Sequence, residues 1–82
     1  MTRTLLLADG SPTIQRVVEL IFADEDVQVT AVTDGAQAMA QLESHPPDIV
    51  LADIGVGRHN GYELAAFVKQ RGALAHIPVL LL

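Results

Sequence analysis

The sequence contains no cysteine and no tryptophan, and its aromatic side chains are limited to two phenylalanines and one tyrosine. The lack of cysteine excludes a disulfide scaffold, a cysteine-ligated zinc site and thiol chemistry. No apolar run approaches the roughly 18 residues of a membrane-spanning helix, so we expect no membrane association. The apolar stretch Leu5–Ala8 near the N-terminus is too short for the core of a secretory signal, which predicts a cytoplasmic location.

Basic residues are scarce: five Lys and Arg stand against ten Asp and Glu, giving a formal net charge of −5. We therefore expect no nucleic-acid binding by this chain, because a phosphate backbone requires a basic face. The composition is 50% apolar, whereas a disordered segment lacks the residues to build a core. With 82 residues, the chain has the length of one small domain.

Four short apolar runs recur along the chain, and the segments between them carry helical patterns. This alternation predicts right-handed β-α-β crossovers and a parallel sheet. The second run alternates apolar and polar residues, as an edge strand does, whereas the others are continuous, as in strands covered on both faces. We therefore predict a doubly wound α/β fold with strand order 2-1-3-4. The runs are Leu5–Ala8, Val27–Val32, Ile49–Ala52 and Val79–Leu82.

Local signals mark where the helices begin and end. Ser11-Pro12 places a capping hydroxyl before a proline at the first helical position. Asp34–Gln37 and Asn60–Glu63 have the spacing of capping boxes. His45–Pro47 ends the second helix, and Gly72 is the expected C-cap of the third. In the first helix, apolar residues at the spacing i, i+3, i+4, i+7, i+8 predict one buried stripe. That stripe is Ile14, Val17, Val18, Ile21 and Phe22.

Two aspartates follow neighbouring strands of the predicted sheet. Asp9 ends the first strand and Asp53 the third, and the order of strands reverses between these two. Each aspartate alone is equally well explained as a turn or capping residue. Together they favour a functional site, because like charges this close repel unless a cation lies between them. Mg²⁺ is the natural candidate, and a carboxylate beside Mg²⁺ can attack phosphorus to form an aspartyl phosphate.

Several segments, in order and spacing, resemble bacterial response-regulator receiver domains of two-component signalling. Leu5–Thr13 resembles their first strand and acidic turn, and Pro47–Asp53 resembles their phosphoacceptor strand. Gly61 follows Asp53 at the spacing of the loop that enters the third helix, and His76–Leu82 resembles the fourth strand. The resemblance implies a flavodoxin-like fold truncated after the fourth strand. Residues 1–82 would be one receiver-like domain that lacks the fifth βα unit at its C-terminus.

The resemblance also implies roles for individual residues. Asp53 would be the nucleophile that accepts a phosphoryl group from a histidine kinase, a phosphotransfer protein or a small phosphodonor. Asp9 would be one acid of the Mg²⁺ pocket, and Gly55 would lend its backbone carbonyl to the metal. Mg²⁺ would neutralise charge on the transferring phosphoryl group, since this chemistry is mostly positioning and electrostatics. Such a module is not an enzyme with turnover on a metabolite.

Two departures from the family pattern keep alternatives open. The family usually has a second acid after the first strand, where this chain has Gly10. The family's Ser or Thr after the fourth strand and the Lys that ends its fifth strand have no counterpart up to Leu82. The runner-up function is therefore a degenerate receiver that binds protein partners without phosphorylation. A third candidate, a small nucleotide-binding domain, rests on the loose glycine pattern Gly55-x-Gly57-x-x-x-Gly61.

The last predicted strand has a consequence of its own. Without a fifth unit, Val79–Leu82 is the other edge of the sheet, and it is apolar and uncharged. Such an edge invites pairing with another chain. We therefore expect either a fragment of a longer protein or self-association through this strand.

Overall fold

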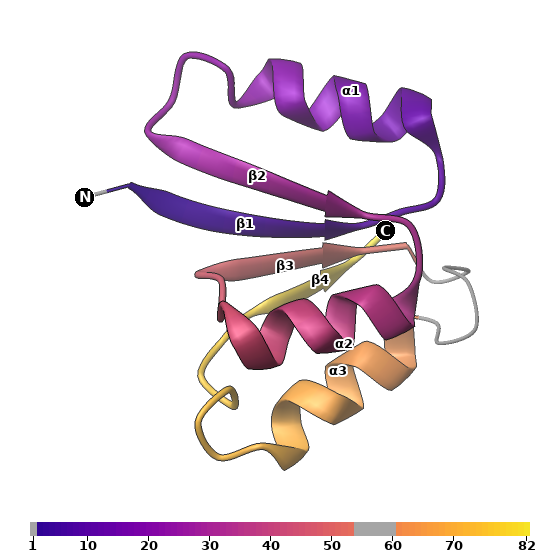
Figure 1. Cartoon of the computed structure of the whole chain (residues 1–82), viewed down its shortest axis with the longest axis vertical. Coiled ribbons are helices and arrows are strands. Elements are labelled where there is room, and N and C mark those ends of the chain that lie inside the picture. Colours follow the sequence, from indigo (N-terminus) through magenta and orange to yellow (C-terminus); the bar gives the residue numbers. More distant parts are fainter. Residues whose placement is uncertain (1, 54–60) are drawn as a thin grey trace.

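The structure is a computed structural model that describes residues 2–53 and 61–82. The predictions that fall on Gly55, Gly57 and Asn60 therefore lie outside the described residues. Strands and helices alternate along the chain, as the sequence predicts (Figure 1). The elements are β1 (Arg3–Ala8), α1 (Pro12–Ile21), β2 (Val27–Val32), α2 (Gly35–Ser44), β3 (Ile49–Ala52), α3 (Gly61–Gln70) and β4 (Val79–Leu81).

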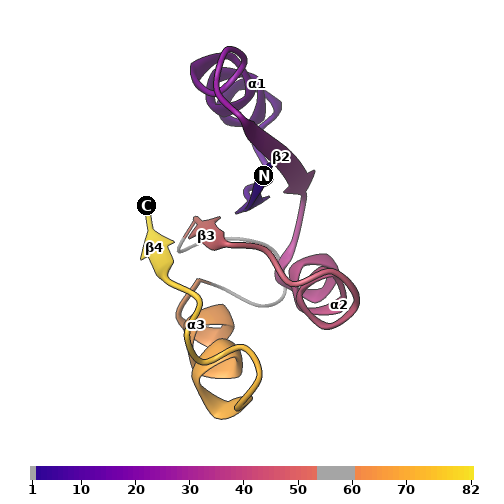
Figure 2. The same cartoon turned by 90° about the vertical axis from the view of Figure 1, so that its left-hand side faces the viewer.

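The strands form one parallel sheet in the order β2-β1-β3-β4, which confirms the predicted order and the predicted edge position of β2. The central strand β1 pairs on both sides, so that Ala8 lies between Val32 of β2 and Ala52 of β3. Helix α1 covers one face of the sheet, and α2 and α3 cover the other (Figure 2). This is the doubly wound, flavodoxin-like arrangement.

Two apolar clusters hold these layers together, one on each face of the sheet. They separate because successive side chains of a strand point to opposite faces. Leu5, Leu7 and Val18 form the smaller cluster beneath α1. The larger cluster lies between the sheet and helices α2 and α3. Its members are Leu6, Ala8, Ala38, Leu42, Val50, Ala52, Leu64, Val68, Leu74 and Ile77.

The caps of α1 and α2 follow the sequence signals with one difference. The hydroxyl of Ser11 accepts a hydrogen bond from the N–H of Ile14 (3.3 Å), with Pro12 at the first turn. The carboxylate of Asp34 accepts from the N–H of Gln37 (2.8 Å). In a capping box the Gln37 side chain would return to the N-cap residue. Instead its carboxamide oxygen accepts from the N–H and the hydroxyl of Thr33, each at 2.9 Å.

The prediction of one buried apolar stripe on α1 is wrong for most of its members. Val18 is buried and Phe22 is half-buried, but Ile14, Val17 and Ile21 keep 38%, 45% and 64% of their surface exposed. The reason is tertiary. Helix α1 lies over β2 and β1, at one end of its face of the sheet. In the described part of the chain, no second helix lies beside α1 on that face (Figure 2).

The end of α3 also differs from its prediction. Gly72 follows the helix, but its backbone is not in the left-handed region, so the helix does not end in a glycine C-cap motif. The chain continues through turns in which the N–H of Leu74 donates to the Arg71 carbonyl (2.9 Å) and that of Ile77 to the Leu74 carbonyl (3.0 Å). Leu74 and Ile77 are buried, and they anchor this connection to the core before β4.

Candidate functional site

The site is built where β1 and β3 end side by side. Ala8 and Ala52 are register partners, so Asp9 and Asp53 are the next residues on two adjacent parallel strands. The N–H of Asp53 donates to the Ala8 carbonyl (2.9 Å), which continues the ladder to the first residue beyond the strand. Adjacent strands lie about 4.8 Å apart. The fold therefore brings the two aspartates together at the point where the strand order reverses.

Asp9 is held in place from three directions. Its side chain is buried, with 6% of the surface of the residue exposed. One carboxylate oxygen, Oδ1, accepts a hydrogen bond from the N–H of Ser11 (2.8 Å). The Asp9 N–H donates to the carbonyl of Val32 at the end of β2 (3.1 Å), and the Asp9 carbonyl accepts from Nε2 of Gln15 (2.7 Å). The carboxylate thus sits on a rigid turn.

Sequence reasoning missed Gln15. Its side chain reaches back from α1 to the backbone of Asp9 and ties the helix to the site. The signal was present, because Gln15 precedes Val18 and Phe22 at the spacing i, i+3, i+7. A polar residue on the inward stripe of a helix requires a hydrogen-bond partner when it is partly buried.

Asp53 is half-buried at the end of β3. The two-residue period of the strands places Asp9 and Asp53 on the same side of the sheet as Leu7 and Leu51. Two carboxylates so placed repel each other, and a cation between them removes that repulsion.

The two aspartates offer oxygen donors, the kind of ligand that a divalent cation such as Mg²⁺ takes. Among residues 2–53 and 61–82, no group of three or more His, Cys, Asp or Glu side chains converges on one point. Mg²⁺ is commonly bound by one or two carboxylates together with waters and phosphate oxygens. Asp9 and Asp53 fit this requirement. Gly55, the predicted carbonyl ligand, lies outside the described residues.

Gly10 occupies the position where the family usually has a second acid. The residue is exposed, and among residues 2–53 and 61–82 a Cβ added to it would approach the Thr33 carbonyl oxygen, at an ordinary contact distance of 3.5 Å. Its backbone is not in the left-handed region. The described part of the fold therefore does not require glycine here and leaves room for a Cβ.

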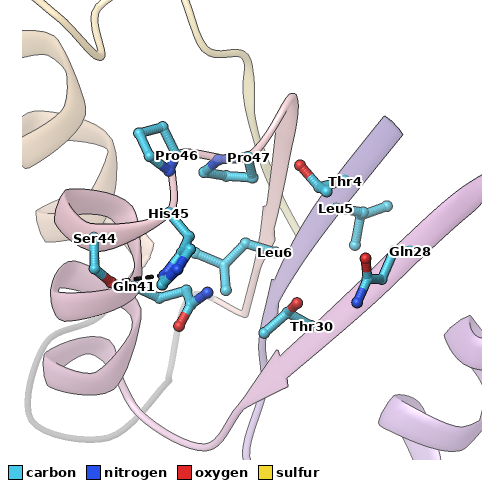
Figure 3. A pocket seen from close by; sticks show the side chains of 10 residues that line it. All are labelled: Thr4, Leu5, Leu6, Gln28, Thr30, Gln41, Ser44, His45, Pro46 and Pro47. Atoms are coloured by element: carbon cyan, nitrogen blue, oxygen red, sulfur yellow. Dashed lines mark hydrogen bonds between the residues drawn. The ribbon is translucent and has the colours of Figure 1, made fainter. Parts of the chain in front are cut away.

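A pocket of about 440 Å³ lies at the opposite end of the sheet, between the first halves of β1 and β2 and the end of α2 (Figure 3). Its polar lining comes from neutral groups such as Thr30 and Gln41, and His45 Nδ1 lies 3.2 Å from the Ser44 hydroxyl. Neither aspartate lines this pocket. It is therefore separate from the candidate site.

Comparison with known proteins defines the family. Residues 5–82 match the response regulator receiver domain family. The chain belongs to this family, which confirms the resemblance noted in the sequence.

Individual relatives agree with this assignment. The protein PilG of Pseudomonas aeruginosa is 31% identical over 78 residues, which are 95% of this chain and 58% of PilG. The N-terminal domain of a response regulator receiver protein from Methanoculleus marisnigri superposes with a TM-score of 0.88 at 30% identity, covering 99% of this chain and 66% of that one. The receiver domain of a sensor histidine kinase from Pseudomonas aeruginosa superposes with a TM-score of 0.89 at 25% identity, covering 99% and 66%. This chain thus spans less than two thirds of PilG.

The described part of the chain contains the helices α1, α2 and α3. None of those helices is both long enough and apolar enough to cross a membrane.

Proposed function

We propose that this chain is a phosphoacceptor module of two-component signalling, in which Asp53 receives a phosphoryl group. The observation that carries the proposal is the juxtaposition of Asp9 and Asp53 at the ends of β1 and β3. The phosphodonor would be a histidine kinase, a phosphotransfer protein or a small phosphodonor. The module accepts and holds the phosphoryl group and does not turn over a metabolite.

The residues of the site have different roles in the proposed phosphoryl transfer. A carboxylate oxygen of Asp53 attacks phosphorus in line with the leaving group, and the new O–P bond forms as the bond to the donor breaks. The leaving group departs with that electron pair: acetyl phosphate releases acetate, whereas a phosphohistidine donor releases its imidazole, which takes up a proton. Asp9 stays fixed through its hydrogen bonds with Ser11 and Gln15, which keeps its carboxyl group at the end of β1 next to Asp53. Asp9 and Asp53 would hold Mg²⁺, which would supply positive charge to offset the anionic phosphoryl oxygens.

The proposed metal has support of two kinds. The donor set at Asp9 and Asp53 suits a small oxygen-seeking cation. The receiver domain of the Pseudomonas sensor histidine kinase described above has a magnesium ion coordinated in its active-site cleft. That finding belongs to the relative, and we extend it to this chain as part of the proposal.

Intact mass spectrometry tests the phosphoacceptor directly. The whole chain is incubated with acetyl phosphate, with Mg²⁺ or with EDTA. We expect a mass increase of one phosphoryl group that requires Mg²⁺ and is absent in Asp53→Asn. Asp24→Asn is the matched control, because Asp24 is exposed in the turn before β2, away from the site. It removes the same charge and should leave the adduct unchanged.

The outcomes separate clearly when circular dichroism is measured on the same samples. A folded chain that forms no adduct contradicts the proposal. An adduct that persists in Asp53→Asn, or one that Asp24→Asn abolishes, contradicts the assignment of Asp53.

One observation favours a second candidate function, a degenerate receiver that binds partners without phosphorylation. Gly10 leaves the site with two carboxylates where the family usually has three acids. The variant Gly10→Asp distinguishes the candidates by calorimetric titration with Mg²⁺. If the native chain binds almost no Mg²⁺ and the variant binds it strongly, the degenerate function is favoured. If both bind, the phosphoacceptor function stands.

A further inference from the structure

The pocket at the end of α2 takes no part in the proposed function. The residues that line it come from β1, β2, the end of α2 and the two prolines that follow, all within residues 4–47 (Figure 3). No residue of β4 lines it, and β3 lies between it and that edge of the sheet. Its volume of about 440 Å³ falls within the range of about 300–1,000 Å³ that small-molecule sites occupy. The pocket is therefore a candidate ligand site of its own.

The pocket has an apolar floor between two polar walls. Leu6 of β1 forms the floor and is 1% exposed. Thr30 is its register partner on β2, so the two side chains point to the same face of the sheet. In Figure 3, Gln28 and Thr30 lie on one side of Leu6, and Gln41 and His45 lie on the other. An apolar base with a few convergent polar groups is typical of small-molecule sites.

Three polar side chains of the two walls are available to a ligand. In the part of the chain that the structure describes, the side chains of Gln28, Thr30 and Gln41 make no hydrogen bond. Thr30 and Gln41 are half-buried, and polar groups that are withheld from water normally find a partner. Each carboxamide offers an acceptor oxygen and two N–H donors, and the hydroxyl offers one donor. The walls can therefore form several hydrogen bonds to one ligand.

A fourth group, the ring of His45, presents an acceptor. The Ser44 hydroxyl donates its one hydrogen to the Ala40 carbonyl (3.0 Å). This hydroxyl must therefore accept in its 3.2 Å contact with Nδ1 of His45. Nδ1 of the neutral ring then carries the hydrogen, which leaves Nε2 as an acceptor. The hydrogen bonds at the end of α2 thus fix the tautomer of a side chain that lines the pocket.

The charge around the pocket disfavours anionic ligands. None of the described residues that line it is Asp, Glu, Lys or Arg. The C-terminal end of a helix carries a partial negative charge, and the pocket lies at that end of α2. Pro46 and Pro47 have no N–H, so the carbonyls of Leu42 and Glu43 receive no helical hydrogen bond. A phosphate or carboxylate would meet no cation here, whereas a group that donates hydrogen bonds is favoured.

We propose that this pocket binds an uncharged nitrogen heterocycle that bears an exocyclic amino group, as an adenine-type nucleobase does. A glutamine carboxamide forms two hydrogen bonds to the amino group and the adjacent ring nitrogen of adenine, and Gln28 and Gln41 each provide one carboxamide. His45 and Thr30 add an acceptor and a hydroxyl, and the apolar floor meets the flat ring. The ligand is a nucleoside or a free base, because a nucleotide adds phosphate that the pocket does not neutralise. The inference is independent of phosphorylation at Asp53.

NMR titration of the whole chain with adenosine tests this proposal. We expect saturable shifts of the backbone amides of Gln28, Thr30, Gln41 and His45, with a dissociation constant below about 1 mM. Inosine, in which an oxygen replaces the amino group, should bind about tenfold more weakly, the effect of losing about one hydrogen bond. Adenosine monophosphate should also bind more weakly than adenosine, because its phosphate meets the negative end of α2.

Paired variants locate the binding groups. Gln41→Leu removes a carboxamide and should weaken adenosine binding about tenfold. Gln70→Leu is the matched control, because Gln70 is exposed on α3 and does not line the pocket. Thr30→Val removes the hydroxyl at nearly constant shape and should also weaken binding, which keeps the test valid if Gln41→Leu fails to fold. Asp53→Asn should bind adenosine as the native chain does, so that a failure of the phosphoacceptor proposal stays distinguishable.

Other results would refute the assignment. The absence of saturable shifts up to about 10 mM adenosine would mean that the pocket is not a site for this ligand. Equal binding of inosine, or tighter binding of adenosine monophosphate, would contradict recognition of an amino group by an uncharged pocket. Shifts centred on Asp9 and Asp53 would place the ligand at the aspartate site instead. Unchanged binding in folded Gln41→Leu and Thr30→Val would remove both groups from the site.

Discussion

The substitution Gly10→Asp is the sharpest test of the electrostatics at the aspartate site. Within residues 2–53 and 61–82 the structure leaves room for a Cβ at this position, because the nearest non-neighbouring atom there is the Thr33 carbonyl oxygen at 3.5 Å. The added carboxylate would directly follow Asp9 in the chain, at the end of the sheet where Asp53 also lies. Gly10→Asn is the matched control, with the same shape and no charge.

Without metal, the added charge should destabilise the chain. A pair of unit charges about 4 Å apart interacts by about 1 kcal/mol in water and about 4 kcal/mol near a protein surface. Position 10 is exposed, so we take the lower figure, about 1 kcal/mol. For a domain of this size that corresponds to a melting temperature about 4–8 °C below that of Gly10→Asn in EDTA.

With Mg²⁺ present, the added carboxylate should stabilise the chain instead of destabilising it. A divalent ion doubles the water-screened attraction to about 2 kcal/mol, which raises the Mg²⁺ affinity between about ten- and a hundredfold. Thermal melting followed by circular dichroism measures the stability, and calorimetric titration measures the affinity. If Gly10→Asp and Gly10→Asn melt at the same temperature in EDTA and in Mg²⁺, then Asp9, position 10 and Asp53 do not form one electrostatic site.

Three further predictions concern the scaffold. In urea unfolding, Leu42→Ala should lower the free energy of unfolding by about 2–5 kcal/mol, because Leu42 is fully buried, whereas Leu20→Ala on the exposed side of α1 should change it by less than about 0.5 kcal/mol. Asp34→Ala should lower the free energy of unfolding by about 0.5–2 kcal/mol, since it removes the acceptor for the N–H of Gln37 (2.8 Å). A smaller loss would mean that the cap contributes little to stability. Glu43→Gln should lower the free energy of unfolding by less than about 1 kcal/mol, because both side chains of its ion pair with Arg71 (3.0 Å) are half exposed and the pair is screened by water. A loss of more than about 2 kcal/mol, measured at high salt, would contradict this.

The sheet could be predicted closely because its signals are local. The apolar runs give the four strands, and alternation in Val27–Val32 identifies the edge strand β2. A strand covered on both faces needs apolar residues at successive positions, whereas an edge strand tolerates polar ones. Once β2 is an edge, the crossover rules leave few orders for the remaining strands.

Only the part of the site that follows from the order of the strands could be predicted from the sequence. Asp9 and Asp53 follow strands that the sequence identifies, so their meeting at one end of the sheet follows from the strand order. The contact of Gln15 with the Asp9 carbonyl was not predicted. It depends on the tilt and rotation of α1 over the sheet, which no local pattern specifies.

What the sequence determined by itself is local: where helices begin, as at Ser11 and Asp34, and which runs form strands. Hydrogen bonds of a cap and the alternation of a strand involve residues close in the chain. The tertiary structure decided which apolar residues are buried. Ile14 and Val18 lie on one predicted stripe, yet Ile14 is 38% exposed and Val18 is 8% exposed, because burial depends on which segments pack against a helix face and not on the periodicity of that face alone.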